Sequence, residues 1–200
     1  MKQTLTFFIL LGLAACDCND NPTPEMNDYL PLAIGNHWDF RAVGSDNDRT
    51  IQHREVVDYV EVNNKNYYLL VSISFPLEGP AYKDSAYYRI DTDGYVYVYR
   101  KDAGPEANLY RLGSKNGDSW TYKSANNDDV TMRVSELDKD IDVAVVRNCK
   151  DYSFDVEQWT DDNYTYTLAP GVGFLKEFSD AWGAGQILKS AHINGKETEY

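Results

Sequence analysis

The sequence predicts an all-β fold: an antiparallel meander of about 10–12 strands that forms a curved sheet, either a half-barrel or a sandwich built from two similar halves. Three observations support this prediction. β-Branched and aromatic residues recur in runs of roughly five to ten. Clusters of Asn, Asp and Gly interrupt these runs, and no long stretch has the period of a helix.

Residues 1–15 have the features of a secretory signal peptide. An apolar run from Thr4 to Ala15 follows Lys2, and it is shorter than the roughly 20 residues needed to cross a bilayer. The segment Leu13-Ala14-Ala15-Cys16 resembles the bacterial lipobox, which implies cleavage before Cys16 and acylation of its thiol. We therefore expect a lipoprotein held in the cell envelope by lipid at Cys16; an ordinary signal peptide with an incidental cysteine is the alternative.

Residues 16–28 are expected to form a flexible tether, because they are polar, contain proline and lack apolar periodicity. Asp17 directly after the lipidated cysteine resembles an inner-membrane retention signal of some bacteria, whereas acidic residues near this position favour surface display in others. We expect the outer membrane rather than the inner, with the leaflet open. Cys18 and Cys149 could form a disulfide in such a compartment, or both could remain thiols.

Residues 29–200 are enough for one β domain with a substantial core, and too few for two domains that each have a core of that size. The chain carries 32 acidic and 19 basic side chains. A negative charge of this size repels phosphate backbones and anionic lipid surfaces, so it argues against a nucleic-acid partner.

The strands are predicted from alternating apolar and polar residues. Val130, Met132 and Val134 form one apolar row against polar neighbours, as in a half-exposed antiparallel strand. The segment 67–75 alternates in its second half only, so one end should be covered on both faces. In the segment 95–99, tyrosines alternate with valines, so neither face of the strand is expected to be fully exposed to solvent.

Turn residues separate these strands. The expected turns lie at Asn63-Asn64, at Asp91-Thr92-Asp93-Gly94, at Asp138-Lys139-Asp140 and at Pro170-Gly171. The last suits a type II turn, because proline sets its own φ and glycine accepts a positive φ.

Two segments share a G-x-x-W-x-aromatic pattern, Gly35–Phe40 and Gly117–Tyr122, and an aromatic-Gly-aromatic hairpin follows each of them. The recurrence predicts two pseudo-repeats at about 35–110 and 117–195. Residues two apart share one face of a strand, so Trp38 with Phe40, and Trp120 with Tyr122, are predicted core residues. A sugar-stacking platform is the alternative role for these aromatic pairs.

The segment Tyr29–Phe40 resembles the Y-x-P-L-x-x-G-N-x-W-x-Y opening of uncharacterised lipoproteins common in Bacteroidota and related Gram-negative bacteria. The segment Ala169–Lys176 is similar to their closing A-x-G-V-G-x-V-K motif, and residues 186–188 to the strand that follows. The resemblance implies an antiparallel β fold and an envelope location. It implies no established activity and no catalytic residues.

No catalytic or cofactor motif is present in the sequence. His37, His53 and His192 are the three histidines, and their spacing matches no zinc signature, so we expect no metal site from them. Nucleophile elbows, phosphate loops and dinucleotide-binding glycines are missing as well, so no catalytic residue and no cofactor is predicted. Asp91 and Asp93 are weak candidates for calcium, although turns favour the same residues.

The leading functional hypothesis is a non-catalytic envelope lipoprotein that binds a glycan, a hydrophobic ligand or a protein partner through a tyrosine-rich sheet face. Tyr95, Tyr97 and Tyr99 would form that face. One alternative is an envelope glycan-processing enzyme with paired carboxylates such as Asp155 and Glu157, which would have to lie about 5–10 Å apart. A second alternative is a scaffold subunit of an envelope assembly, which a large exposed apolar surface would favour.

Overall fold

The computed structural model describes residues 26–44, 48–101, 104–124, 127–141, 144–156 and 164–200. The predicted signal peptide, Cys16, Cys18 and most of the tether therefore lie outside the described residues. The first element is a 3₁₀ helix, η1 (Met26–Tyr29). The strands are β1 (His37–Ala42), β2 (Gln52–Val62), β3 (Lys65–Ser74), β4 (Tyr82–Ile90), β5 (Tyr95–Tyr99), β6 (Ala107–Arg111), β7 (Ser119–Lys123), β8 (Asp129–Ile141), β9 (Ala144–Val156), β10 (Tyr164–Ala169), β11 (Gly173–Ser179), β12 (Ala184–Ile193) and β13 (Lys196–Glu199).

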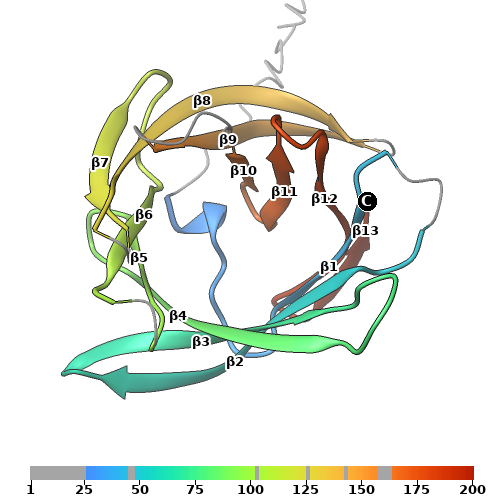
Figure 1. Ribbon diagram of the computed structural model, residues 1–200, viewed down its shortest axis with the longest axis horizontal. Coiled ribbons are helices and arrows are strands. Elements are labelled where there is room, and N and C mark those ends of the chain that lie inside the picture. Colours follow the sequence, from blue (N-terminus) through green and yellow to red (C-terminus); the bar gives the residue numbers. More distant parts are fainter. Residues whose placement is uncertain (1–25, 45–47, 102–103, 125–126, 142–143, 157–163) are drawn as a thin grey trace, which may run out of the picture.

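The strands form one antiparallel sheet that curls into a nearly closed barrel (Figure 1). The order around it is β6-β5-β4-β3-β2-β1-β12-β11-β10-β9-β8-β7, and β13 pairs with β12 outside this path. Sequential strands are neighbours in each half, and β1 joins the halves by pairing with β12. The predicted all-β antiparallel meander is confirmed, and the described residues form 13 strands where about 10–12 were expected. In the described part of the chain, no helix is long and apolar enough to span a membrane.

The turns follow the turn residues with one exception. Asn63 and Asn64 both have positive φ, 52° and 60°, as the hairpin between β2 and β3 requires. The prediction of a turn at Asp138–Asp140 is wrong, because β8 continues to Ile141. The register shifts between Leu137 and Lys139, because Leu137 pairs with Cys149 and Lys139 with Val146. One residue of β8, Asp138, therefore lies opposite two residues of β9, and this β-bulge lets β8 continue without reversing the chain.

Residues 26–36 run across the inside of the barrel ring (Figure 1), and we call them the plug. Hydrogen bonds fasten the plug to the turns of the sheet. The N–H of Gly171 donates to the carbonyl of Asp28 at 2.8 Å, and the N–H of Asn194 donates to Oδ1 of Asn36 at 2.9 Å. Tyr29 and Leu30 of the plug are buried and belong to the hydrophobic core. The plug is thus part of the core.

The aromatic pairs of the two G-x-x-W motifs lie inside the barrel to different extents. Trp38 and Phe40 on β1 are completely buried, Trp120 on β7 is buried, and Tyr122 is half-buried against the core. Nε1 of Trp38 donates a 2.6 Å hydrogen bond to the carbonyl of Val172. These positions serve packing rather than an accessible stacking platform.

β6 and β7 end the strand order, and no ladder joins them in the described chain. Side chains that donate to backbone carbonyls close this seam. Trp120 Nε1 donates to the carbonyl of Asn108 at 3.1 Å, and the Tyr152 hydroxyl donates to that of Arg111 at 3.2 Å. The buried Lys150 ammonium donates to the carbonyls of Leu112 and Ser114 at 2.7 and 2.6 Å.

Candidate functional site

The barrel has two chemically different ends. Because the meander is antiparallel, successive turns alternate between the ends. The β2–β3, β4–β5, β10–β11 and β12–β13 turns therefore share one end, which the plug also occupies; we call it the plug end. The β3–β4, β5–β6 and β11–β12 connections lie at the other, the far end.

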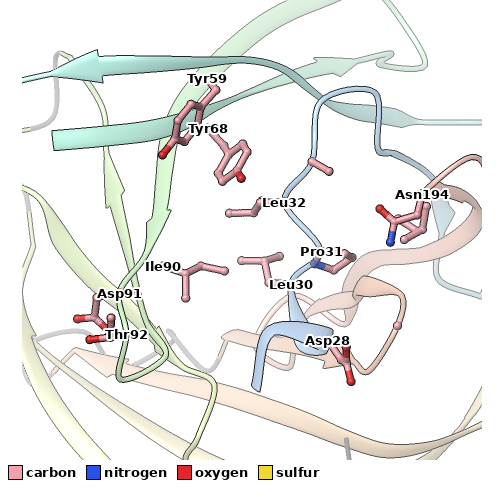
Figure 2. A pocket seen from close by; sticks show the side chains of 13 residues that line it. Asp28, Leu30, Pro31, Leu32, Tyr59, Tyr68, Ile90, Asp91, Thr92 and Asn194 are labelled. Atoms are coloured by element: carbon pink, nitrogen blue, oxygen red, sulfur yellow. The ribbon is translucent and has the colours of Figure 1, made fainter. Parts of the chain in front are cut away.

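A cavity of about 570 Å³ opens at the plug end (Figure 2). Its walls are Asp28, Leu30, Pro31, Leu32, Ala33, Tyr59, Tyr68, Ile90, Asp91, Thr92, Gly171, Ile193 and Asn194. Leu30 and Leu32 of the plug point towards Ile90 across the cavity, and the two tyrosine rings lie together on one side. Its volume lies within the range of small-molecule sites, and so does its mixture of apolar walls with a few polar groups.

A β-bulge aims Tyr59 at this cavity. The pairing of β2 with β3 shifts register between Val56 and Asp58, so Val57 is an extra residue. Strict alternation from the buried Val56 would place Tyr59 on the outer face of the sheet. The extra residue reverses this, and Tyr59 pairs directly with Tyr68 on the inner face. Bulges re-aim side chains in this way near binding sites.

The Tyr59–Tyr68 pair is a ready-made aromatic surface. The ring centroids are 4.7 Å apart with an interplanar angle of 49°, and Tyr59 is 50% exposed. Asp28, Asp91, Thr92 and Asn194 place hydrogen-bonding groups around the apolar floor. Of the residues that the structure describes, two carboxylates and no basic side chain line the cavity, so an anionic ligand is disfavoured.

The far end contains a smaller cavity of about 280 Å³. An ion pair lies in its floor, because Arg54 donates to both carboxylate oxygens of Glu177, at 2.5 and 2.8 Å. Gln52 and Gln186 complete a network around this pair. Arg54 also lies against the rings of Phe40 and Phe174, at 4.9 and 5.1 Å from their centroids.

The charges of the far-end cavity are satisfied within the protein. Burial alone would lower the pKa of Arg54, but the charge and hydrogen bonds of Glu177 raise it above its usual value. Arg100 pairs with Asp84 at 2.5 Å where the cavity opens. Burial raises the pKa of the tyrosines in the walls, Tyr88, Tyr110 and Tyr166. The arrangement is that of a packed polar core, so the plug-end cavity is the better ligand site.

The predicted row of Tyr95, Tyr97 and Tyr99 lies on the outer face of β5, while Val96 and Val98 point into the barrel. All three tyrosines are half-buried. The Arg89 guanidinium lies 3.7 Å from the ring centroid of Tyr97, and Tyr99 packs against the rings of Tyr67 and Tyr87. The row therefore forms part of an outer aromatic cluster.

Tyr95 and Asp93 lie together at a cavity on the outer surface. Both line an open surface cavity of about 500 Å³, together with Arg111, Gly113, Ser114, Asp118 and Ser119. The Arg111 guanidinium lies between two rings, at 4.9 Å from the centroid of Tyr95 and 4.8 Å from that of Trp120. The structure thus brings Tyr95 and Asp93 together, at a site separate from Tyr97 and Tyr99.

The remaining candidate acids are placed as follows. Oδ1 of Asp91 accepts the backbone N–H groups of Asp93 and Tyr95, at 3.0 and 2.9 Å, which organises the β4–β5 turn. Asp155 is exposed on β9 and pairs in register with Thr131, while Glu157 lies outside the described residues. Cys149 is buried, and its thiol lies 3.3 Å from the carbonyl of Val146. Cys18 lies outside the described residues, so both alternatives for Cys149, a disulfide with Cys18 or a thiol, stay open.

Glu106 holds the outer aromatic cluster together. It accepts hydrogen bonds from Arg89, from Lys65 at 2.7 Å and from the hydroxyl of Tyr67 at 2.9 Å. Burial alone would raise the pKa of Glu106, but these hydrogen bonds lower it to about 2.

We expect Glu106 to make the protein less stable in acid. A carboxyl whose pKa is depressed on folding stabilises the protein above its unfolded value, 4.5, and loses that contribution as the pH falls towards about 2. Replacing Glu106 with Gln should therefore reduce stability at pH 7 and flatten its dependence on pH between about 4.5 and 2. Urea unfolding curves recorded at several pH values test this. Equal pH slopes for the two proteins would show that other groups cause the acid response.

Tyr59 and Tyr68 are the site residues that sequence reasoning missed. The signal was present only indirectly, because alternation in β2 breaks after Val56, where two apolar residues stand side by side. That break is compatible with a strand covered on both faces as well as with a bulge. Only the register of the hairpin distinguishes them.

Comparison with solved structures shows a distant similarity in fold. No family profile and no curated protein matches the chain. A crystal structure from Bacteroides fragilis, provisionally described as an exported protein with a YmcC-like fold, matches at a TM-score of 0.46 and 11% identity. The match covers 86% of this chain and 99% of the other.

Proposed function

We propose that this chain is a non-catalytic, lipid-anchored lipoprotein of the cell envelope that binds an uncharged glycan in the plug-end cavity. The anchor is Cys16, and the outer membrane is the favoured location. The signal segment and lipobox at residues 1–16 support the anchor. The resemblance of residues 29–40 and 169–176 to Bacteroidota lipoproteins supports the compartment.

One observation supports a glycan as the ligand. The half-exposed ring of Tyr59 packs against Tyr68 and lines the same cavity as the apolar side chains of the plug. Flat aromatic faces stack on the apolar face of a sugar ring. Carboxylates at the rim accept hydrogen bonds from its hydroxyl groups, and an amide can both accept and donate. Asp28 and Asp91 supply acceptors, and Asn194 supplies both donor and acceptor. A neutral sugar fits this cavity better than an acidic one.

Binding of the natively lipidated protein, in detergent, to an array of neutral and acidic oligosaccharides tests the proposal. We expect binding to neutral members, and replacing Tyr59 with Ala should weaken it by about tenfold, which corresponds to about 1.4 kcal/mol. Tyr59→Phe should retain it, because the ring and not the hydroxyl supplies the contact. Tyr82→Ala is the matched control: Tyr82 is similarly exposed, at 61%, but lies at the far end.

Three results would contradict the proposal. Affinity lost in Tyr82→Ala and kept in Tyr59→Ala would move the site to the far end. Affinity lost only in Tyr97→Ala would move it to the outer aromatic cluster. Preference for acidic glycans would contradict the ligand class. Mass spectrometry of the native protein tests the anchor separately, and an unacylated N-terminus would overturn that part.

A further inference from the structure

The three histidines of the chain meet on the outer face of the sheet, whereas the plug-end cavity lies on the inner face. His37 on β1 pairs in register with His192 on β12. The neighbouring strand β2 contributes His53, which pairs with Asp39 of β1. The edge strand β13 contributes Glu197, which pairs with His192. Register alone therefore assembles three imidazoles and two carboxylates from four strands.

Two of the imidazoles and Glu197 converge. The rings of His37 and His192 are stacked, with centroids 5.1 Å apart and an interplanar angle of 7°. Oε2 of Glu197 lies 3.2 Å from Nδ1 of His192 and 4.0 Å from Nε2 of His37. One ligand atom from each residue lies within 4.8 Å of the other two. Among the described residues, this is the one such group of three or more histidine, cysteine or acidic side chains.

The second nitrogen of His37 has a partner suited to a metal ligand. Its Nδ1 lies 3.3 Å from the carbonyl oxygen of Gly35. A proton on Nδ1 that is donated to this carbonyl leaves the lone pair of Nε2 directed towards Glu197. Metal-binding histidines usually donate their other N–H to a carbonyl or carboxylate in this way, which fixes the tautomer.

We infer that His37, His192 and Glu197 bind a divalent transition-metal ion of the zinc class. Two imidazoles and one carboxylate, with water in the fourth position, form a recognised donor set for Zn²⁺. Zinc bonds of about 2.0–2.2 Å bring tetrahedral ligand atoms to about 3.3–3.6 Å from one another. The three side chains are 29, 34 and 53% exposed, so small rotations at the surface achieve this without moving the sheet.

His53 has a different part in the cluster. Its Nδ1 lies 2.9 Å from Oδ1 of Asp39, and its Nε2 lies 3.8 Å from Oε2 of Glu55. Its ring centroid is 5.3 Å from that of His37. His53 thus has its own carboxylate partners beside the metal-binding group, which makes it the natural control.

Competition between the untagged full-length protein and a chromophoric chelator for Zn²⁺ tests this inference. We expect saturable binding with one ion per chain, and His37→Gln, His192→Gln and Glu197→Gln should each weaken it by at least about tenfold. His53→Gln should change it by no more than about threefold. Because the ion links β13 to β12 and β1, Zn²⁺ should also raise the melting temperature of the wild type but not of His192→Gln. Mg²⁺ should do neither.

The inference fails if the wild type shows no saturable Zn²⁺ binding. It also fails if His192→Gln binds Zn²⁺ as tightly as the wild type, since the ion would then lie elsewhere, for example on cysteine thiols. Equal losses in His53→Gln and His37→Gln would contradict the assigned ligand set. Circular dichroism of each variant distinguishes a lost ligand from a lost fold.

Discussion

Replacing Glu177 with Gln is expected to destabilise the protein by about 3–5 kcal/mol, because it leaves the guanidinium of Arg54 buried without its counter-charge. Both side chains are shielded from water, with 11 and 14% exposure, so solvent screens the pair little. The amide of Gln can accept one hydrogen bond, but it cannot replace the paired contacts at 2.5 and 2.8 Å. Urea unfolding followed by tryptophan fluorescence measures the loss.

The double variant Arg54→Met, Glu177→Leu is the matched comparison. Removing both charges avoids the uncompensated ion, and apolar side chains suit the neighbouring rings of Phe40 and Phe174. We expect it to be more stable than Glu177→Gln, although Gln52 and Gln186 lose partners. If the single variant loses less than about 1 kcal/mol, water must reach Arg54 and the far-end floor is not a dry core.

Replacing Gly173 with Ala is expected to cost about 3 kcal/mol, as the sum of backbone strain and overpacking. Gly173 has a φ of +92°, which L-residues with a side chain rarely adopt. An added Cβ would also lie 3.1 Å from two atoms of the Trp38 indole and 3.2 Å from Cδ of Pro31. The clash pushes on the tryptophan and on the plug together.

Gly171→Ala separates these two causes. Gly171 also has a positive φ, +72°, but an added Cβ would meet nothing within 4 Å. Its cost should be limited to backbone strain, about 1–2 kcal/mol. Thermal unfolding of both variants gives the comparison. Equal losses would show that the Trp38 environment yields easily and that the plug is not tightly packed against β11.

The backbone was largely predictable from sequence, because period-2 alternation and turn residues report local geometry. Asn63-Asn64 and Pro170-Gly171 turn as their chemistry requires. Two β-bulges were not predictable from these local patterns. Opposite Asp138, an extra residue of β9 forms a bulge, and β8 continues where a turn was expected. In β2 the extra residue Val57 brought Tyr59 to the inner face. A bulge depends on the partner strand, which the local pattern does not specify.

The sites were less predictable than the fold, since they are made across strands. His37 and His192 come from opposite ends of the chain and meet only because β1 closes the meander against β12. Tyr95, Tyr97 and Tyr99 do share one face, as alternation predicts. Their engagement by Arg89, Arg111 and other tyrosines depends on neighbouring strands and on Glu106.

The seam between β6 and β7 is the place where the barrel is expected to open most easily. Elsewhere, separating two neighbouring strands breaks a row of main-chain hydrogen bonds, whereas here it breaks side-chain hydrogen bonds from Trp120, Lys150 and Tyr152. Small openings at this place therefore need less energy than those at the β1–β12 junction. Amide protons of β6 and β7 should accordingly exchange with deuterated solvent sooner than those of β1 and β12.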